Sequence, residues 1–470
     1  MPMFEMMMNS SNHLLNRRRF LSRTWAGLGS IALGSLLERD AAAAIPKAFQ
    51  AVAPKAKSVI FFHMTGAPSH LDLFDDKPVL RKYDRQLAPE ELFKGKRFSF
   101  LRGHPKLLGS PYQFSKYGQS GAEISELLPR LSAVADDLCF VKSMFTTEFN
   151  HGPAQLVFHT GLNRQGNPSI GSWTTYGLGS DSENLPAYVV FLKGNTPGAG
   201  ANLWKSGFLP SVNQGVQLRG EGDPVLFLNS PEGVAPEDRR RTLDSIEALN
   251  RLNFELVGDP EIQTRIAQYE MAFRMQSSVP DLVDLSQEDA ATLGMYGKGE
   301  FADQCLKARR LVERGVRFVE LFHGDWDTHA SQKGRLASNC KEVDQPIAAL
   351  ITDLKQRGLL DQTLIVWGAE FGRTPMLQGD ESPAKCGRDH QKDAFTIWMA
   401  GGGIKGGTTY GSTNELGNEV AENPVRVRDM HATMMHLLGI NHEKLTYRFQ
   451  GLDQRLTGVE KARVVSEILG

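Results

Sequence analysis

Short apolar runs alternate with amphipathic stretches along most of this chain of 470 residues. The run at 58–63 is followed by Thr65-Gly-Ala-Pro68, a pattern typical of a buried strand that ends in a tight turn. Strands that alternate with helices predict an α/β protein with a mostly parallel sheet. We expect strands over 58–63, 138–144, 185–192, 316–322, 364–367 and 395–400, and helices over 122–135, 262–275, 301–314, 343–356 and 427–438.

The stretch over 205–300 differs from the rest of the chain. It is polar, and it includes a dense run of charged residues at 237–241. We predict that it forms an insertion or a lid over the sheet, within one domain that extends over 45–470.

The N-terminal residues have the features of an export signal. The pair Arg18-Arg19 precedes Phe20-Leu21, a weakly apolar stretch covers 25–37, and alanines occupy 41–44. Basic residues, a short apolar stretch and small residues in this order are typical of a signal peptide, and an arginine pair is typical of the twin-arginine type. The apolar stretch is shorter than the roughly 20 residues that span a bilayer. The alternative is an exposed basic N-terminus with a chance arginine pair.

We therefore predict a twin-arginine signal peptide at 1–44. The mature protein would be periplasmic or extracellular, with no stable membrane span after cleavage. Removal of 1–44 would change the formal net charge from -1 to -3, because it takes away five basic and three acidic residues.

The charge balance restricts the partners of the chain. Lys and Arg number 53 against 54 for Asp and Glu, so the overall field does not favour nucleic acid, and we expect no nucleic-acid partner. Attraction for an anion must come from a local site. Four cysteines in a chain of this length are too few for a disulfide scaffold, although two disulfides and four buried thiols both stay open.

Histidine and acidic side chains follow the strand predicted at 58–63, namely His63, His70, Asp72 and Asp75. In open α/β sheets, ligands bind at the carboxyl ends of the strands, and imidazole and carboxylate groups there suit a divalent metal ion. The alternative is that the two aspartates form turn hydrogen bonds or helix caps.

A denser group follows the strand predicted at 316–322. His323, Asp325, Asp327 and His329 are four candidate ligands within seven residues, and we interpret them as a metal-binding segment. The alternative is a solvated loop that caps the helix after it.

Two weaker groups lie at the ends of other predicted strands. Glu370 and Arg373 follow the strand at 364–367, and a carboxylate beside an arginine often forms a structural ion pair. Asp389 and His390 precede the strand at 395–400. Because all these groups lie at strand ends of one predicted sheet, we expect them to converge.

Asn150-His151-Gly-Pro153 begins a predicted helix that continues through Phe158. A helix N-terminus offers free N–H groups and the positive end of the helix dipole, which suit an oxyanion. His151 is thus a candidate nucleophile, acid or base, or metal ligand. A histidine that only caps the helix is an equally open interpretation.

In the order in which they occur, these motifs make most of 57–461 resemble the alkaline phosphatase and sulfatase superfamily. The segment from His151 to Gln155, followed four residues later by Thr160-Gly161, is similar to the sulfatase signature Cys-x-Pro-Ser-Arg, four residues and Thr-Gly. Asp325-x-x-x-His329 is similar to the Asp-x-x-x-His metal motif of the phosphatases. The segments at 369–372, 390, 428–440 and 451–453 also resemble parts of this superfamily.

Within the superfamily, the chain most closely resembles a bacterial family of exported, sulfatase-like proteins known as a domain of unknown function. The resemblance implies an alkaline-phosphatase-like three-layer sandwich, with a mostly parallel central sheet and helices on both faces. The residues that carry the resemblance are Gly66-Ala-Pro68-Ser69, Leu71 to Asp75, Trp326-Asp327-Thr328-His329, Glu370 to Pro375 and Gly387-Arg388-Asp389-His390.

The chain departs from the sulfatase pattern at three positions. His151 takes the place of the cysteine that sulfatases convert to formylglycine, and a histidine cannot form an aldehyde hydrate. Gln155 replaces an arginine, and Phe371 replaces a metal ligand. Arg373 is the residue expected to restore a positive charge for an anionic ester.

These departures put a two-metal site in doubt, and we predict about one divalent ion per chain, with His151 as nucleophile or as acid or base. The metal would be Zn, Ca, Mn or Mg. His151 and Arg373 are the candidate catalytic residues. The candidate ligands are Asp72, Asp327, His329, Glu370 and His390, with Asp325 and Asp389 in reserve.

Our leading hypothesis is therefore an exported, metal-dependent hydrolase of a sulfate or phosphate ester, for which a sulfated glycan is one candidate substrate. The main alternative is a non-catalytic protein of the same fold that binds an anionic glycan or an envelope partner, which the three departures favour. An isomerase or mutase that uses phospho-histidine is a third, weaker hypothesis.

Overall fold

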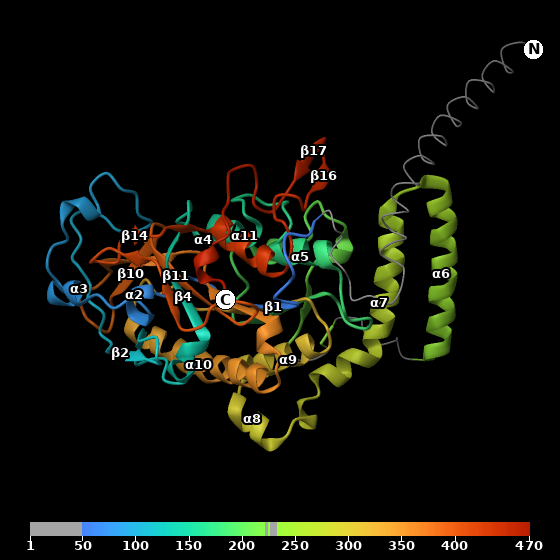
Figure 1. Cartoon of the computed structure of the whole chain (residues 1–470), viewed down its shortest axis with the longest axis horizontal. Coiled ribbons are helices and arrows are strands. Elements are labelled where there is room, and N and C mark those ends of the chain that lie inside the picture. Colours follow the sequence, from blue (N-terminus) through green and yellow to red (C-terminus); the bar gives the residue numbers. More distant parts are fainter. Residues whose placement is uncertain (1–48, 221–223, 226–232) are drawn as a thin grey trace, which may run out of the picture.

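The computed structural model describes residues 49–220, 224–225 and 233–470. The signal peptide predicted at 1–44 lies outside the described residues. The predicted α/β fold is confirmed, with a central sheet that has helices on both faces (Figure 1). In spatial order its strands are β12 (Thr408–Tyr410), β4 (Leu138–Phe145), β11 (Phe395–Ala400), β8 (Thr363–Gly368), β1 (Ser58–Met64), β7 (Phe318–His323), β5 (Tyr188–Lys193) and β6 (Val216–Leu218), while β15 (Val425–Arg426) also pairs with β4.

The sheet is mostly parallel. β1 pairs in parallel with β7 and β8, and β5 pairs in parallel with β6 and β7. β11 runs antiparallel to both β4 and β8. Because of this reversal, the residues just before β11 reach the same edge of the sheet as the residues just after β1, β7 and β8.

The central strand β1 is buried on both faces, so its side chains are almost all apolar. Ile60 and Phe62 pack into one hydrophobic core with α9 (Glu300–Glu313) and α10 (Gln332–Gln356). Val59 and Phe61 pack into a second core on the opposite face. The helices of that face are α4 (His151–Thr160), α5 (Ile170–Leu178) and α11 (Val427–Leu437), which completes three layers (Figure 1).

Every predicted strand is present, with its ends within three residues of the prediction. The helix predicted over 122–135 is wrong. Residues 122–125 form strand β3 (Ala122–Ser125), which pairs with β2 (Phe114–Tyr117), and a 3-10 turn follows at Leu131–Asp137. Pro129 lies in the middle of the predicted helix, where it removes a helical hydrogen bond and disfavours helical geometry in the residue before it.

The stretch over 205–300 contains two long helices, α6 (Pro236–Val257) and α7 (Pro260–Val283). They lie side by side at the β5–β6 end of the sheet (Figure 1), and α7 contacts α9. A short helix α8 (Ala290–Tyr296) then packs against α10. The interpretation of this stretch as an insertion or lid stays a prediction.

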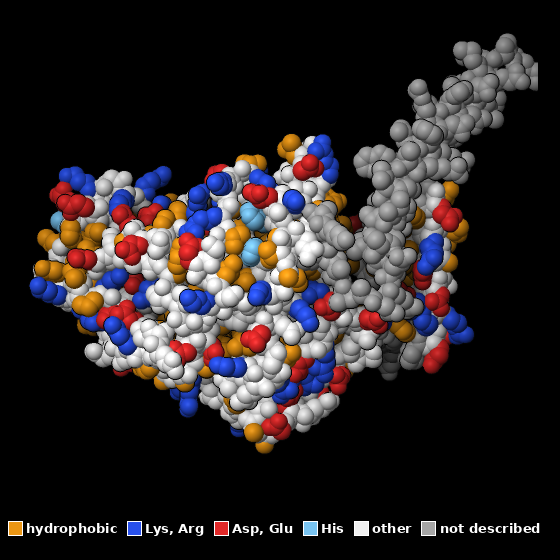
Figure 2. All heavy atoms as spheres, in the orientation of Figure 1, with side chains coloured by type: hydrophobic (Ala, Val, Ile, Leu, Met, Phe, Trp, Pro, Cys, Tyr) orange, Lys and Arg blue, Asp and Glu red, His pale blue; other side chains and the backbone are white. Residues whose placement is uncertain are grey.

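Basic and acidic side chains are interspersed on the face of the molecule shown in Figure 2. Among the described residues, no helix combines the length and the apolar character needed to cross a membrane. All four cysteines are buried and form no disulfide with one another.

The 3-10 turn that replaces the predicted helix depends on Asp344 of α10. The two carboxylate oxygens of this buried residue accept hydrogen bonds of 2.8 Å from the backbone N–H groups of Arg130 and Leu131. Asp344→Ala leaves both N–H groups without a partner, so we expect the free energy of unfolding to fall by about 1–3 kcal/mol. Urea denaturation measures this change, with the exposed Asp361→Ala as control. Equal effects of the two substitutions would contradict the prediction.

Candidate metal centre

The loops after β1, β7 and β8 meet at the carboxyl edge of the sheet. The loop after β7 carries Asp327 and His329, and the loop after β8 carries Glu370. A hairpin of β9 (Gly372–Gln378) and β10 (Gly387–Gln391) follows and carries Arg373 and His390. The start of α4 adds His151 from across this edge.

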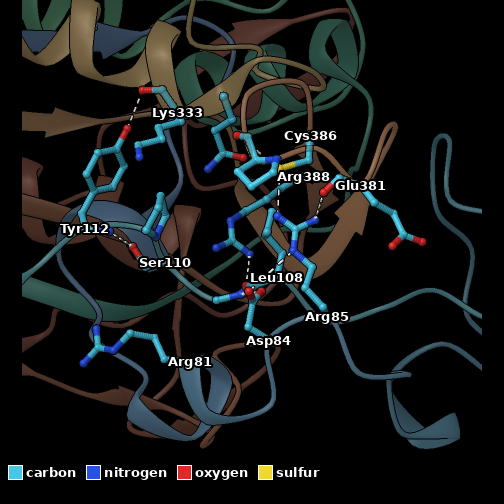
Figure 3. Close-up of a pocket in the computed structure, with 14 residues that line it drawn as sticks. Arg81, Asp84, Arg85, Leu108, Ser110, Tyr112, Lys333, Glu381, Cys386 and Arg388 are labelled. Atoms are coloured by element: carbon cyan, nitrogen blue, oxygen red, sulfur yellow. Dashed lines mark hydrogen bonds and ion pairs between the residues drawn. The ribbon is translucent and has the colours of Figure 1, made fainter.

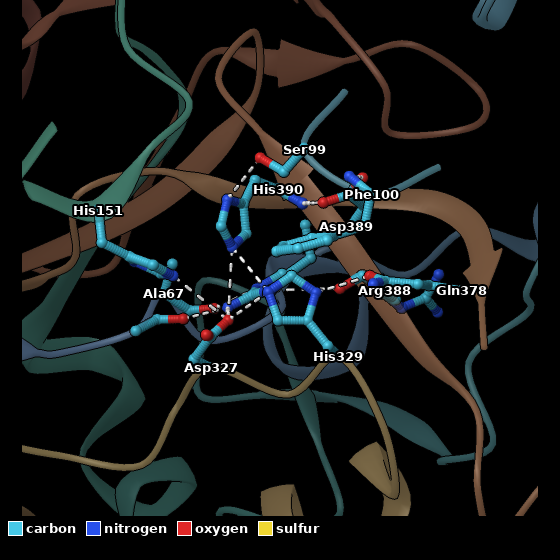
Figure 4. Close-up of polar contacts among 12 residues, drawn as sticks. Ala67, Ser99, Phe100, His151, Asp327, His329, Gln378, Arg388, Asp389 and His390 are labelled. Atoms are coloured by element: carbon cyan, nitrogen blue, oxygen red, sulfur yellow. Dashed lines mark hydrogen bonds and ion pairs between the residues drawn. The ribbon is translucent and has the colours of Figure 1, made fainter. Parts of the chain in front are cut away.

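Four of these residues form a compact group. His151, Asp327, His329 and His390 each offer one ligand-type atom, and these atoms all lie within 4.8 Å of one another (Figure 4). The Nε2 atom of His329 is 2.8 Å from Oδ1 of Asp327 and 2.9 Å from Nε2 of His390. The Nε2 atom of His151 is 3.3 Å from the same carboxylate oxygen. Three imidazole nitrogens and one carboxylate oxygen therefore converge.

In His390 and His329, the Nδ1 atom that points away from the group of four contacts a carbonyl oxygen. Nδ1 of His390 is 2.7 Å from the backbone oxygen of Phe149, and Nδ1 of His329 is 2.6 Å from Oε1 of Gln378. A carbonyl oxygen only accepts, so each Nδ1 carries a proton and each neutral ring turns an Nε2 lone pair into the group. Two lone pairs that face each other at 2.9 Å need a proton or a cation between them. The donor set thus fits a divalent metal ion.

Burial and neighbouring charges shift the pKa values of this group in different directions. Burial lowers the pKa of His390 to about 4, and the positive charge of Arg373 acts in the same direction. Burial also opposes the charged form of His151, but its contacts with Asp327 and Glu370 prevail and raise the pKa to about 9. The pKa of Asp327 lies well below its usual range, because contacts with the three histidines outweigh the effect of burial.

Arg373 is fully buried, and its guanidinium group is occupied by protein atoms. It donates to Asp327 Oδ1 over 2.6 Å and to the backbone oxygens of Gly66, Ala67 and Arg388. Arg373 therefore holds Asp327 against the turn after β1. Its assignment as a catalytic residue stays a prediction.

Glu370 lies behind His151 and outside the group of four. Its Oε1 atom accepts hydrogen bonds from His151 Nδ1 (2.7 Å), the backbone N–H of Gly66 (3.1 Å) and the side-chain amide of Gln155 (3.2 Å). The carboxylate is fully buried. In this arrangement Glu370 orients His151, and its role as a metal ligand stays a prediction.

Asp72 also lies outside the group of four. It belongs to the short helix α2 (His70–Leu73), where its carboxylate pairs with Arg388 over 2.8 and 3.2 Å and accepts a hydrogen bond of 2.5 Å from Gln332. The structure thus brings together three of the five predicted ligands, Asp327, His329 and His390, and places Asp72 and Glu370 elsewhere.

The two reserve ligands have other positions. Asp389 accepts hydrogen bonds of 2.7 and 2.8 Å from the backbone N–H groups of Phe100 and Leu101, so it holds that loop beside the group of four (Figure 4). Asp325 occupies a left-handed turn with φ of 67°. Both assignments stay predictions.

The loop around Phe100 is a part of the site that the sequence did not indicate. The ring of Phe100 lies 4.6 Å from that of His329, and Ser99 Oγ is 3.1 Å from His390 Nδ1. No regular pattern marks residues 93–103. The only signal was a mixture of basic and aromatic residues, including Lys96, Arg97 and Arg102.

A line of buried polar residues also escaped the sequence reasoning. His159 of α4, Glu320 of β7 and Tyr188 of β5 lie within the core, next to His63. A charged residue in the middle of an otherwise apolar strand is the signal that could have revealed Glu320.

A separate cavity of about 560 Å³ is lined partly by the β9–β10 hairpin and partly by residues 108–112 (Figure 3). None of the four converging residues lines it. Arg388 forms part of its wall and pairs with Asp72, while Arg81 at its rim pairs with Asp76 over 2.5 and 2.9 Å.

Comparison with known families assigns the chain to one of them. Residues 56–469 match the model of the family described as "Protein of unknown function (DUF1501)". The match covers most of the chain, so the protein belongs to this family. A search of curated proteins found no match.

Several solved structures are similar to the chain at low identity. PsFucS1 sulfatase from Pseudoalteromonas sp. is 12% identical, with a TM-score of 0.37 over 84% of this chain and 69% of that chain. Phosphonate monoester hydrolase of Agrobacterium radiobacter is 11% identical, with a TM-score of 0.36 over 87% and 77%. The lipoteichoic acid synthase LtaP from Listeria monocytogenes is 11% identical, with a TM-score of 0.35 over 88% and 77%.

The buried pair of Asp72 and Arg388 supplies a test of the role of Asp72. Arg388→Met leaves a buried carboxylate without its cation, so we expect the free energy of unfolding to fall by about 3–5 kcal/mol. The double substitution Asp72→Asn and Arg388→Met removes both charges and should restore part of that loss, as thermal unfolding would show. If Asp72→Asn abolished metal binding in a protein that stays folded, Asp72 would be a ligand instead.

Proposed function

We propose that this protein is a metal-dependent hydrolase of a sulfate or phosphate ester, exported through the twin-arginine pathway to the periplasm or beyond. The observation that carries the proposal is the convergence of His151, Asp327, His329 and His390 within 4.8 Å. The arginine pair before Phe20 supports the export step.

The donor set favours zinc among the metals considered. Three imidazole nitrogens and one carboxylate oxygen suit Zn²⁺, whereas Ca²⁺ and Mg²⁺ prefer oxygen ligands. A bound divalent ion would polarise the ester oxygens and lower the pKa of a coordinated water.

Neighbouring side chains hold Asp327 and His151 in place, and the start of α4 favours an anionic ligand. Arg373 and the turn after β1 hold Asp327, and Glu370 holds the ring of His151 through Nδ1. The side chain of His151 is 24% exposed, but its Nε2 atom is buried and faces Asp327, so this nitrogen is placed to serve as a metal ligand. His151 also begins α4, where the positive end of the helix dipole favours an anion.

The loop at 93–103 supports the proposal that the substrate is an anionic ester that carries a ring. Phe100 is 56% exposed beside His329, and the exposed side chains of Arg97 and Arg102 belong to the same loop, whereas Lys96 there pairs with Glu419. An aromatic face next to positive charges suits a sulfated sugar or an aryl ester.

The alternative is a binding protein that does not catalyse. The burial of Arg373 supports it, because this guanidinium is occupied by Asp327 and by backbone oxygens and is not free for an ester. Gln155 supports it as well, since its amide contacts Glu370 and the backbone of Ala199.

We expect the purified mature protein to hold about one divalent ion per chain, with zinc the most abundant. His329→Ala removes one of four converging donors, so its metal content should fall to near zero, while His436→Ala on α11 leaves it unchanged. Elemental analysis measures both. A wild-type protein free of metal after gentle purification would refute the proposed function.

Turnover separates the enzyme from the binding protein. A panel of chromogenic sulfate, phosphate and phosphodiester substrates, tested with added Zn, Mn, Ca or Mg, should reveal activity that His151→Ala abolishes. If no substrate of the panel is hydrolysed, while the protein still holds its metal and binds sulfated polysaccharide, the non-catalytic binding protein is favoured.

Phe100→Ala should raise KM for a ring-bearing substrate by about two- to tenfold and change kcat little. The reason is that an aromatic contact contributes about 0.5–1.5 kcal/mol to binding, and Phe100 is placed to contact the bound ester without a contact to His151. Phe449→Ala is the control, because this exposed ring lies on the strand Tyr447–Phe449, in another part of the chain. A fall in kcat with unchanged KM would contradict this role.

A further inference from the structure

A line of four buried side chains continues from Glu370 into the sheet. Oε2 of Glu370 is 3.2 Å from Nε2 of His63, and Nδ1 of His63 is 2.9 Å from Nε2 of His159. Nδ1 of His159 is 2.8 Å from Oε1 of Glu320, and the hydroxyl of Tyr188 donates to the other oxygen of Glu320. The four side chains come from β1, α4, β7 and β5, on the face of the sheet that α4 covers.

All four residues are at most 1% exposed. Buried polar groups without partners are costly, so the protons of this line must be arranged to satisfy each contact. The aromatic rings of Phe158 and Phe322 flank His63 and His159 at centroid distances of 5.3–5.7 Å.

The contacts allow only two arrangements of the protons if both imidazoles are neutral. A neutral imidazole donates from one nitrogen and accepts at the other, so all hydrogen bonds along the line point the same way. In one arrangement, protonated Glu320 donates to His159, His159 donates to His63, and His63 donates to the carboxylate of Glu370. In the other, Glu370 carries the proton, every bond is reversed and Glu320 carries the negative charge.

The partners at the two ends decide between these arrangements. Glu370 also accepts from the backbone N–H of Gly66, the amide of Gln155 and Nδ1 of His151. Glu320 has the hydroxyl of Tyr188 alone besides His159. A buried negative charge is stabilised where more donors surround it, so the charge belongs on Glu370.

The acidity of the interior groups agrees with this choice. Burial raises the pKa of Glu320 to about 8, so its neutral form is favoured at neutral pH. Burial lowers the pKa of His159 to about 3 and also lowers that of His63, so both rings stay neutral.

The geometry points to His63, His159 and Glu320 as positioning residues of the metal centre. They form a line of close contacts that ends at Oε2 of Glu370, while Oε1 of Glu370 accepts from Nδ1 of His151 and leaves Nε2 of that ring facing Asp327. This inference deepens the proposed function and rests on it, because the value of a fixed His151 ring lies in the metal site.

The tautomers of the two interior histidines test the arrangement without any metal or substrate. ¹⁵N NMR of the metal-free full chain at neutral pH, labelled at histidine, should show His63 and His159 as neutral rings with the proton on Nε2. Rings with the proton on Nδ1, or imidazolium rings, would overturn the inference.

A pair of substitutions at Glu320 tests its effect on the metal centre. Glu320→Gln resembles the neutral acid, because its amide donates to His159 and its oxygen accepts from Tyr188, so the zinc affinity should stay within about twofold. Glu320→Leu removes the donor, and loss of such outer support weakens metal binding by about tenfold or more. Competition titration with zinc measures both, with Glu342→Leu as control, since that glutamate pairs with His323 outside the line.

The possible failures are distinguishable. If Glu320→Gln weakens zinc binding as much as Glu320→Leu does, the negative charge lies on Glu320 and the inference is wrong. A wild-type protein that binds no zinc would overturn the proposed function, whereas Nδ1–H tautomers in a protein that does bind zinc would overturn this inference alone. The NMR result on the wild-type chain stands even if Glu320→Leu fails to fold.

Discussion

Gly66 joins the three loops on which the candidate metal centre depends. Its backbone N–H donates to Glu370 and its backbone oxygen accepts from Arg373. Its φ is 105°, and a Cβ atom there would lie 2.4 Å from the backbone nitrogen of Asp327. Only a glycine allows the turn after β1 to adopt this conformation and approach so closely. Through this one residue, the ends of β1, β7 and β8 hold Asp327, Arg373 and Glu370 in a fixed relation.

Part of this site could be predicted from the sequence because strand ends in an α/β protein meet at one edge. The end of the strand predicted at 316–322 indicated Asp327 and His329, and the start of a predicted helix indicated His151. The position of His390 was harder to predict from strand ends, because its strand β10 comes before β11, whereas the other residues follow their strands. The reversed direction of β11 brings it to the common edge, and strand direction depends on long-range pairing that no local pattern records.

The positions of Asp72 and Glu370 relative to the site could not be predicted for a related reason. Asp72 has the chemistry of a ligand, but Arg388 approaches it from 316 residues away and neutralises it. Glu370 lies behind His151 because the N–H of Gly66 and the amide of Gln155 hold its carboxylate. In both cases the nearest partner decides the role, and partners distant in sequence become visible only when the sheet is assembled. The helix predicted over 122–135 failed for a local reason, since Pro129 interrupts it.

A core that contains Glu320, His159 and His63 is not the most stable core that this sheet could have. Buried polar residues can often be replaced by apolar ones of similar volume with no loss of stability, so stability alone does not account for them. What the apolar residues cannot do is hold a negative charge at one end of a line and a proton at the other. Glu370 accepts hydrogen bonds at Oε1 and contacts His63 through Oε2, so only the Nε2 atom of His151 faces the converging donors. The buried polar line costs stability and gives His151 a defined orientation at the metal centre. A functional site is where a fold is expected to depart from an apolar core.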